Sequence, residues 1–246
     1  MNFTILTFDT IDSTNTEALK QAKAGAKEGL CVVAREQTAG RGRHGRTWVS
    51  GKDAGLYFSL VLKPKLETQY LPLVTLMAGI AVHDTLAELG LAPDIKWVND
   101  ILVDERKIAG VLAETTETDD GVAVIVGIGI NLRSTNFPPE IAASATSIEE
   151  AGVGSTLNLT ERLTGHLAHF YEQLGTANGP TAIIDEWRRR SSYFSGKRVR
   201  VATGNDMLTG VTHGLEPNGA LRVRKDDGST SIIQAGDVER LRADCD

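Results

Sequence analysis

The segment Gly40-Arg41-Gly42-Arg43-His44-Gly45-Arg46-Thr47-Trp48 holds the residue types in this chain that are best suited to chemistry. Its glycines let the backbone approach a ligand closely, and its arginines present planar forks of donors that match carboxylates and phosphates. The tryptophan can cover a flat base or an apolar ring. This pattern predicts a loop that closes over an anionic ligand with a flat or apolar part. A surface loop without a ligand would not explain why its charges are all arginine.

The same run also fits the dinucleotide fingerprint G-x-G-x-x-G, which works only between a strand and a helix. Residues 30–34 are typical of a strand before it. Residues 56–62 after it are typical of another strand, and Gly51 and Gly55 interrupt the segment between. No Gly-Lys-Ser/Thr ends the run. A Rossmann site and a P-loop are therefore both disfavoured.

Two further segments place polar groups where elements begin or break. Ser13-Thr14-Asn15 opens an expected helix, and it either caps that helix or offers donors to a polar ligand group. Lys96-Trp97-Val98-Asn99-Asp100 interrupts a strand. It is either a simple turn or a pair of polar side chains facing an anionic site, directly or through a Mg²⁺ that substrate phosphates also hold.

Lys107 and three glycines occupy two expected strands. Lys107 is either a solvated edge lysine or a compact charge directed at a carboxylate or phosphate, and Gly110 would let a ligand come close to it. Gly127 and Gly129 interrupt a strand of the buried type. Because glycine weakens a strand interior, either a ligand or a neighbouring backbone must fill the space beside them.

The composition limits the class of protein. The chain has 246 residues, of which 41% are hydrophobic and 24% charged, so it can form one or two domains with a sizeable core. A net charge of −6 argues against a general nucleic-acid binder. No apolar run reaches about 18 residues and no signal-peptide pattern is present, so no membrane partner and a cytoplasmic location are expected. Cys31 and Cys245 form no disulfide or metal spacing.

The elements that position these residues follow from periodicity and turn signals. Residues 3–8 predict a strand, and Thr14-Asn15-Thr16-Glu17 predicts a capping box that opens a helix. Further helices are expected at 71–89, about 147–151, 160–174 and 181–191, and strands at 94–97, 101–103, 107–116 and 122–132. From Ser195 onward short strands alternate with turns, one of them at 204–205, which predicts a small β-barrel. The pattern indicates mixed antiparallel hairpins with helices.

These segments, in this order, resemble the hallmarks of the biotin protein ligase family from about residue 8 to the C-terminus. One departure is Val98, where the family usually has proline. The resemblance implies an α+β fold: a mixed, largely antiparallel sheet with helices, like that of class II aminoacyl-tRNA synthetases, at 1–194, and an SH3-like domain at 195–246. Some members carry an N-terminal DNA-binding domain and repress transcription, whereas this chain resembles the monofunctional type.

The resemblance also implies a reaction and a site. Biotin is adenylated by ATP to biotinyl-5′-AMP, and the biotin is then transferred to a lysine of a biotin carboxyl carrier domain of acetyl-CoA carboxylase or a related carboxylase. Arg41, Arg43 and Lys107 would act catalytically by offsetting the repulsion between carboxylate and phosphate. The residues implied around biotin are Ser13, Thr14, Asn15, Gln37, Gly40, Arg41, Gly42, Arg43, Lys107, Gly110 and Gly127. Those implied around the adenylate are Arg43, Arg46, Trp48, Asn99 and Asn131.

Within that site the resemblance places Trp48 over the adenine, Asn131 in a hydrogen bond to it, and Asp100 near Mg²⁺. No nucleic-acid partner is expected, and a homodimer formed through sheet edges is possible. Two alternatives stay open. A lipoate–protein ligase would share the fold and the adenylation chemistry but lacks the Gly/Arg loop. A non-catalytic biotin-binding regulator would need a DNA-binding element, and none precedes Phe3.

Overall fold

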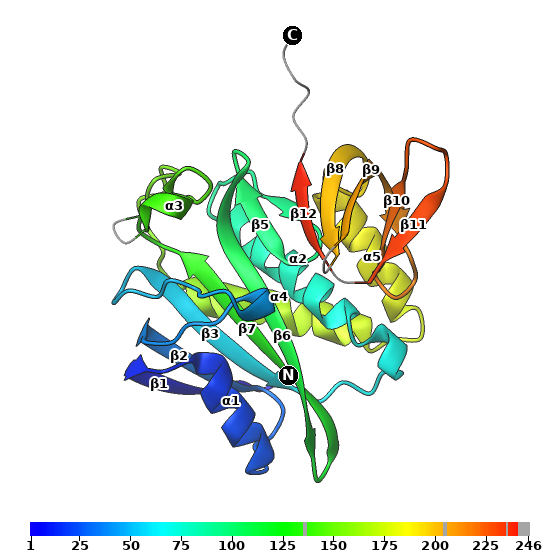
Figure 1. The fold of residues 1–246 in the computed structure, drawn as a ribbon. Coiled ribbons are helices and arrows are strands. Elements are labelled where there is room, and N and C mark those ends of the chain that lie inside the picture. Colours follow the sequence, from blue (N-terminus) through cyan, green and yellow to red (C-terminus); the bar gives the residue numbers. More distant parts are fainter. Residues whose placement is uncertain (135–136, 204–205, 235, 241–246) are drawn as a thin grey trace.

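The computed structural model describes residues 1–134, 137–203, 206–234 and 236–240, arranged as two β-sheets with helices (Figure 1). The turn expected at 204–205 and Cys245 lie outside the described residues. The strands are β1 (Thr4–Ile11), β2 (Leu30–Gln37), β3 (Gly55–Leu62), β4 (Asp94–Lys96), β5 (Asp100–Val103), β6 (Arg106–Thr118), β7 (Gly121–Asn131), β8 (Ser195–Thr203), β9 (Asp206–Leu215), β10 (Leu221–Arg224), β11 (Thr230–Ile233) and β12 (Asp237–Arg240). The helices are α1 (Thr14–Lys23), α2 (Leu73–Ala87), α3 (Pro139–Ala142), α4 (Leu159–Leu174) and α5 (Gly179–Arg190), with single 3₁₀ turns η1 (Arg43–Gly45) and η2 (Thr68–Tyr70).

The larger sheet has seven strands in the order β1-β2-β3-β7-β6-β5-β4. Only the β1–β2 pair is parallel, because α1 crosses between these two strands, and the remaining pairs are antiparallel. The expected mixed, largely antiparallel sheet is therefore confirmed. In the central β6–β7 pair Gly110 lies opposite Gly129, and Leu112 lies opposite Gly127. This register brings the glycines of the two strands onto one small area of the sheet.

Helices cover both faces of this sheet (Figure 1). On one face Val61 and Ile125 pack with Ala18 and Ala22 of α1. On the other face the alternate residues of the same strands belong to the main core with α2, α4 and α5. Because both faces are covered, every residue of β3 is buried. Apart from Ser59, the sequence of β3 is correspondingly apolar along its length rather than alternating.

Helix α2 is the central helix of the core and is apolar around most of its circumference. The stretch Thr68–Ala87 that ends in it is long and apolar enough to span a membrane by length and composition, although no uninterrupted apolar run of that length was expected. Most of this stretch is buried inside the protein, which is the usual state of a core helix.

The smaller sheet is antiparallel, in the order β11-β10-β9-β8-β12. Among the described residues its edge strands β11 and β12 are not paired with each other, so the sheet is open rather than a closed barrel. It touches the larger unit through Trp97, whose indole Nε1 donates to the Gly219 carbonyl at 2.9 Å. This hydrogen bond joins the polar turn before β5 to the C-terminal sheet.

Two local expectations differ from the structure, and two elements were not expected. Residues 147–151 form turns rather than a helix, because the amides of Ile148 and Glu149 donate to the backbone at the end of β7. The capping box does not form: Ser13 is the residue before the helix and makes no side-chain cap, and the Thr14 amide donates instead to Gln37. The short helix α3 and the last strand β12 were not predicted from the sequence.

Candidate active site

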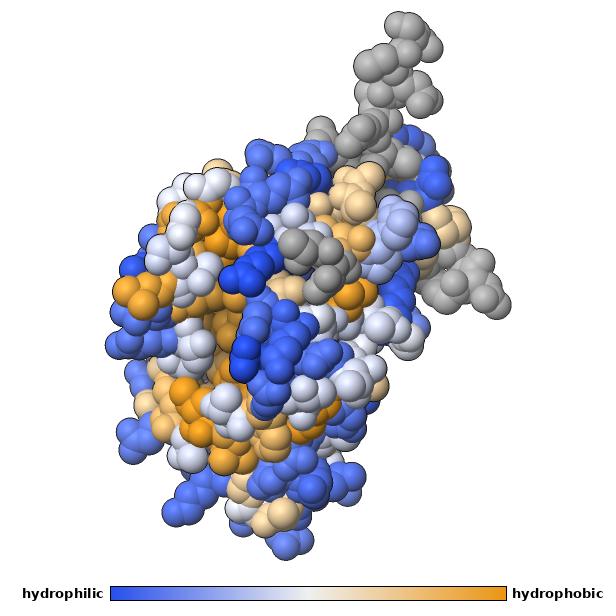
Figure 2. Space-filling view, turned by 90° about the vertical axis from the view of Figure 1, so that its left-hand side faces the viewer, coloured by the Kyte–Doolittle hydropathy of each residue, from blue (hydrophilic) through white to orange (hydrophobic). Residues whose placement is uncertain are grey.

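A pocket of about 250 Å³ opens between the loop 38–50, the start of α1 and the strands β5, β6 and β7. Apart from Gly40, every residue implied by the resemblance lines it, Asp100 included. Gly40 instead packs inside the loop, where a Cβ would come within 2.5 Å of the Trp48 carbonyl and the Ser50 hydroxyl. Figure 2 shows the side of the molecule on which α3 lies, where apolar surface borders a hollow next to strongly hydrophilic side chains.

One end of the pocket is a network of neutral polar side chains. Gln37 Oε1 accepts from the Thr14 amide at 2.8 Å and from the Thr14 hydroxyl at 3.1 Å. The hydroxyl of Ser59, fully buried on β3, lies 2.8 Å from Thr14 Oγ1 and 2.6 Å from Asn15 Oδ1. These contacts fix the orientation of each amide and hydroxyl group. The network suits a neutral ligand group that both donates and accepts hydrogen bonds.

The space beside Gly127 is filled by a side chain. A Cβ built on Gly127 would lie 2.1 Å from Asn15 Oδ1. The two explanations left open for this glycine were a ligand and a neighbouring backbone, and the structure shows a third. Gly127 lets the Asn15 amide lie flat against β7, where its Nδ2 donates to Glu114 at 2.8 Å.

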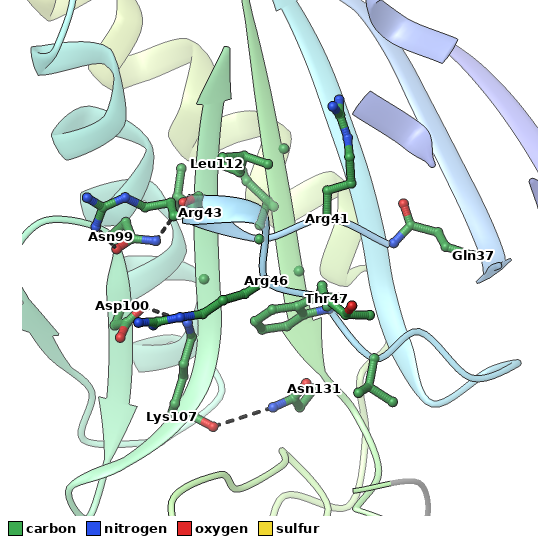
Figure 3. Close-up of a pocket in the computed structure, with 18 of the residues that line it drawn as sticks. Gln37, Arg41, Arg43, Arg46, Thr47, Asn99, Asp100, Lys107, Leu112 and Asn131 are labelled. Atoms are coloured by element: carbon green, nitrogen blue, oxygen red, sulfur yellow. Dashed lines mark hydrogen bonds and ion pairs between the residues drawn. The ribbon is translucent and has the colours of Figure 1, made fainter. Parts of the chain in front are cut away.

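The other end of the pocket is cationic. Lys107 Nζ lies 2.6 Å from one oxygen of Asp100, and Lys96 Nζ lies 3.2 Å from the other. Burial works to raise the pKa of the Asp100 carboxyl, but the two lysines outweigh it and hold this pKa below its ordinary value. Asp100 therefore stays ionised between two ammonium groups. In Figure 3 Arg46 also points toward this carboxylate.

Arg43 connects three parts of the molecule. Its Nη1 donates to Asn99 Oδ1 at 3.0 Å, and its Nη2 donates at 3.2 Å to the carbonyl of Gly236, which directly precedes β12 of the C-terminal sheet. Asn99 in turn donates from Nδ2 to the Val111 carbonyl of β6 at 2.9 Å. The peptide bond between Trp97 and Val98, just before this turn, is cis. The turn with Asn99 thus holds the side chain of Arg43 at the rim of the pocket.

Trp48 rests on the glycines of the central strands. A Cβ built on Gly129 would lie 2.4 Å from the indole ring, and one on Gly110 would lie 3.2 Å from it. Lys107 Nζ lies 5.3 Å from the centroid of the same ring, within the range of a cation–π contact. The indole Nε1 is buried and has no hydrogen-bond partner among the described residues. The two glycines therefore form the floor on which this ring is stacked.

Asn131 holds the backbone of Lys107 in place. Its Nδ2 donates to the Thr146 carbonyl at 3.0 Å and reaches the Lys107 carbonyl at 3.4 Å (Figure 3). The Lys107 amide also donates to the Ser144 carbonyl at 2.8 Å. Because the donor group of Asn131 is engaged, its Oδ1 is the atom left to accept a hydrogen bond from a ligand. A ligand amino group fits that position.

Several residues in or next to the pocket were not predicted from the sequence. Glu114 accepts from Arg41 at 2.7 Å, and no sequence pattern pointed to it. Ser59 lies in a continuous apolar strand and gave no signal. The remaining wall is apolar and includes side chains from the region of α3, which the sequence did not indicate. Its members include Phe58, Leu112, Ile128, Phe137 and Ile141.

Comparison with known proteins identifies the family of this chain. A family model described as Biotin/lipoate A/B protein ligase family matches residues 7–131, which is half of the chain. A second, described as Biotin protein ligase C terminal domain, matches residues 194–241. The chain belongs to the biotin protein ligase family. Its Gly/Arg loop, polar turns and glycine-bearing strands are thus placed within that family's catalytic unit.

Individual members of the biotin protein ligase family are similar along nearly the whole chain. The bifunctional ligase/repressor BirA of Bacillus spizizenii is 36% identical over 237 residues, covering 94% of this chain and 72% of the relative. The biotin–[acetyl-CoA-carboxylase] ligase of Mycobacterium tuberculosis is 34% identical over 239 residues, covering 94% of this chain and 86% of the relative. The biotin protein ligase of Aquifex aeolicus in complex with biotin and ATP superimposes with a TM-score of 0.81 at 28% identity, covering 97% of this chain and 99% of that one.

Proposed function

We propose that this protein adenylates biotin with ATP and transfers the biotin to a lysine of a carrier domain. The observation that carries the proposal is the division of the pocket. Thr14, Asn15 and Gln37 form a neutral polar end, apolar side chains line the middle, and Lys107 stands at a cationic end. Biotin has the same three parts, a cyclic urea, an apolar ring with an alkyl chain, and a carboxylate.

The first step joins two anions. A carboxylate oxygen of biotin attacks the α-phosphorus of ATP, and the bond from that phosphorus to the oxygen bridging to the β-phosphate breaks, which releases pyrophosphate. Repulsion between carboxylate and phosphate is the main obstacle, and Lys107 with Arg43 and Arg46 supplies the opposing charge from positions that are already ordered. Trp48 would cover the adenine, and Asn131 Oδ1 would accept from its amino group.

Mg²⁺ accompanies ATP in this proposal. Among the described residues no three His, Cys, Asp or Glu side chains gather into a metal site, and Asp100 is the one carboxylate that lines the pocket. Magnesium commonly takes one or two carboxylates together with waters and substrate phosphates. A single carboxylate therefore fits an ion that arrives with ATP. The ion would supply positive charge to the phosphates, with Asp100 as its protein ligand.

The second step is acyl transfer to the partner. A lysine amine of a biotin carboxyl carrier domain attacks the carbonyl carbon of biotinyl-5′-AMP, AMP leaves with the bonding electrons, and the amine loses its proton to water. No protein nucleophile is required. The relatives named as acetyl-CoA-carboxylase ligases support a carrier domain of that enzyme as the partner. Pairing of two copies through a sheet edge and a cytoplasmic location stay predictions from the sequence.

The test is pyrophosphate release by the purified protein with ATP and Mg²⁺. Biotin should support release, whereas lipoate and octanoate at the same concentrations should not. Adding a biotin carboxyl carrier domain should then give one biotinyl group on one lysine, detected by mass spectrometry. Pyrophosphate release that is equally fast with lipoate would instead indicate a lipoate–protein ligase. Absence of release with every acid would contradict the proposal.

A further inference from the structure

Glu114 lies where the Gly/Arg loop, helix α1 and strand β6 meet. Its Oε2 accepts from Arg41 Nη2 at 2.7 Å and from Asn15 Nδ2 at 2.8 Å. The Glu114 side chain is 27% exposed and that of Arg41 is 41% exposed, so the pair lies at the rim of the pocket. One carboxylate thus binds both the loop above the pocket and the polar network at its closed end.

The loop that carries Arg41 is a small hairpin. The Gly42 amide donates to the Arg46 carbonyl at 2.7 Å, and the Trp48 amide donates to the Gly40 carbonyl at 3.0 Å. These bonds give the hairpin its shape but do not attach it to the sheet below. The base of the loop is held by backbone bonds, because the Thr38 and Ala39 amides donate to the carbonyls of Ile11 and Asp12 at 2.9 and 2.8 Å. Toward its tip, side chains attach it: Arg43 attaches one side to Asn99, and Arg41 attaches the other side to Glu114.

Arg41 is directed away from the cationic end of the pocket. Figure 3 shows Arg43 pointing toward Asn99 and Arg46 toward Asp100, while Arg41 extends to the opposite side of the loop. Because it extends to the opposite side of the loop (Figure 3), where it pairs with Glu114, it adds little to the field that a carboxylate or phosphate near Lys107 would experience. The catalytic role that the resemblance implies for Arg41 therefore does not follow from this geometry.

We propose that Glu114 is a positioning residue that, through Arg41, holds the Gly/Arg loop closed over the biotin end of the pocket and, through Asn15, orients the polar groups that receive the biotin head. This inference rests on the proposed function for its kinetic consequence. Its structural part, the attachment of the loop, does not depend on which acid the pocket binds.

Three variants separate the two contacts of Glu114. Glu114→Gln keeps an amide oxygen that can accept from Asn15 but removes the charge that pairs with Arg41. Arg41→Gln removes the other member of the pair. The double variant Glu114→Gln/Arg41→Gln completes the cycle. Asp120→Asn is the matched control, because Asp120 pairs with Lys63 at 2.9 Å at the far end of the β6–β7 hairpin.

The first measurement is hydrogen exchange of residues 38–48 in the protein without ligands. Both single variants should speed exchange there by the same factor, roughly threefold to fivefold for a partly exposed pair, and the double variant should not add to it. Asp120→Asn should leave exchange in this segment unchanged. Unchanged exchange in Glu114→Gln would overturn the attachment role, whether or not the protein proves to be a biotin ligase.

The second measurement separates KM from kcat in biotin-dependent pyrophosphate release. Glu114→Gln and Arg41→Gln should each raise the KM for biotin and its dissociation rate, and the double variant should match them, while kcat stays within about twofold of the parent because Lys107 and Arg43 remain. If Arg41→Gln lowers kcat strongly and Glu114→Gln does not, Arg41 acts on the reacting charges and the positioning role of Glu114 is wrong.

Discussion

Lys107 is held at both its backbone and its ammonium group before any ligand arrives. Its amide and carbonyl bond to the segment that follows α3, and its Nζ lies between the Asp100 carboxylate and the ring of Trp48. A charge that is fixed in this way need not reorganise when the substrates meet. The sequence alternative of a solvated edge lysine is therefore wrong, because the side chain is only 33% exposed and lines the pocket.

Lys107→Ala should slow biotin-dependent pyrophosphate release by roughly a hundredfold, since one hydrogen bond to a charged group is worth about 1.5–3 kcal/mol. Lys96→Ala is the control, because Lys96 pairs with the same carboxylate but does not line the pocket. Lys96→Ala should slow pyrophosphate release much less than Lys107→Ala. An equal fall in the rate of both variants would mean that the charge balance around Asp100, rather than Lys107 itself, limits pyrophosphate release. The melting temperature of each variant checks that the fold is intact.

The two strand glycines should separate biotin binding from ATP binding. In Gly129→Ala the new methyl group would enter the space of the Trp48 ring, and in Gly127→Ala it would enter that of the Asn15 amide. We expect Gly129→Ala to raise the KM for ATP about tenfold with a smaller effect on biotin, and Gly127→Ala to do the reverse. Steady-state kinetics with each substrate varied in turn measures this. A common effect of both variants on both substrates would show general damage to β7 instead.

At the scale of elements, the Gly/Arg loop depends on neighbours distant in the sequence. Arg43 attaches it to the turn before β5 and to the backbone of the C-terminal sheet, and Arg41 attaches it to β6. A closed loop excludes water and stray amines from a reactive mixed anhydride. Retention of the intermediate is therefore a property of the attachments of the loop as well as of its own residues.

Arg43→Gly should release biotinyl-5′-AMP at least about tenfold faster, because two hydrogen bonds from a charged group are lost. Adenylation should fall less, since Lys107 and Arg46 remain at the cationic end. The measurement is biotin labelling of added serum albumin in the presence of ATP, with Arg35→Gln as a control, because Arg35 forms an exposed pair with Asp53 outside the pocket. Labelling confined to the carrier domain, with adenylation still rapid, would assign retention to other residues.

Most elements were predictable because their signals are local. The apolar run of β3, the turn-bounded hairpin β6–β7 and the long apolar helix α2 follow from periodicity and turn residues within each segment. Residues 147–151 have helical composition, but two of their amides donate hydrogen bonds to the backbone at the end of β7 instead of to a helix. A local sequence pattern cannot predict hydrogen bonds to such a distant strand. Strand β12 has four residues and depends on pairing with β8, so it too is set by a partner distant in sequence.

The site was predictable from residue type and order, but the contacts inside it were not. The charged loop, the two polar turns and the strand glycines indicated part of the polar lining, and the family resemblance supplied the rest, including Gln37 and Asn131. What the glycines accommodate could not be read from β7 alone, since Asn15 and Trp48 arrive from segments about 110 and 80 residues earlier. The role of Ser59 was not predicted, because a single serine in an otherwise apolar strand gives no sign that its buried hydroxyl binds other side chains.

At the scale of the whole molecule, helices α2 and α5 are joined by a bidentate ion pair. Arg190 Nε and Nη2 lie 2.6 and 2.7 Å from the two oxygens of Asp84, and both side chains are 18% exposed. Burial would raise the pKa of Asp84, but hydrogen bonds from His83 and Arg190 outweigh it and lower this pKa to about 2. The pair therefore stabilises the helical layer that supports the sheet from behind.

This pair should give the free energy of unfolding a defined pH dependence. The pKa of Asp84 is lowered on folding, so its contribution, on the order of 2 kcal/mol, is present above about pH 4 and is lost as the pH falls toward 2. Asp84→Asn should be destabilised at pH 6 and approach the parent near pH 2.5, as measured by urea unfolding. Asp226→Asn removes a similar bidentate pair with Arg198 at an exposed position, where the effect should be small at every pH. If the unfolding free energies of the parent and Asp84→Asn change in parallel with pH, the stabilising role assigned to ionised Asp84 is wrong.

The placement of Trp48 gives the molecule a built-in optical reporter. The chain has three tryptophans, all within the described residues, and Trp97 and Trp187 are 2% and 0% exposed inside the core. Their emission should stay constant while the pocket fills. Trp48 lines the pocket beneath an ammonium group, so a base stacked on its ring or a displaced Lys107 alters its surroundings directly. Changes in the intrinsic fluorescence of the native protein thus follow occupancy of this one site, without any attached label.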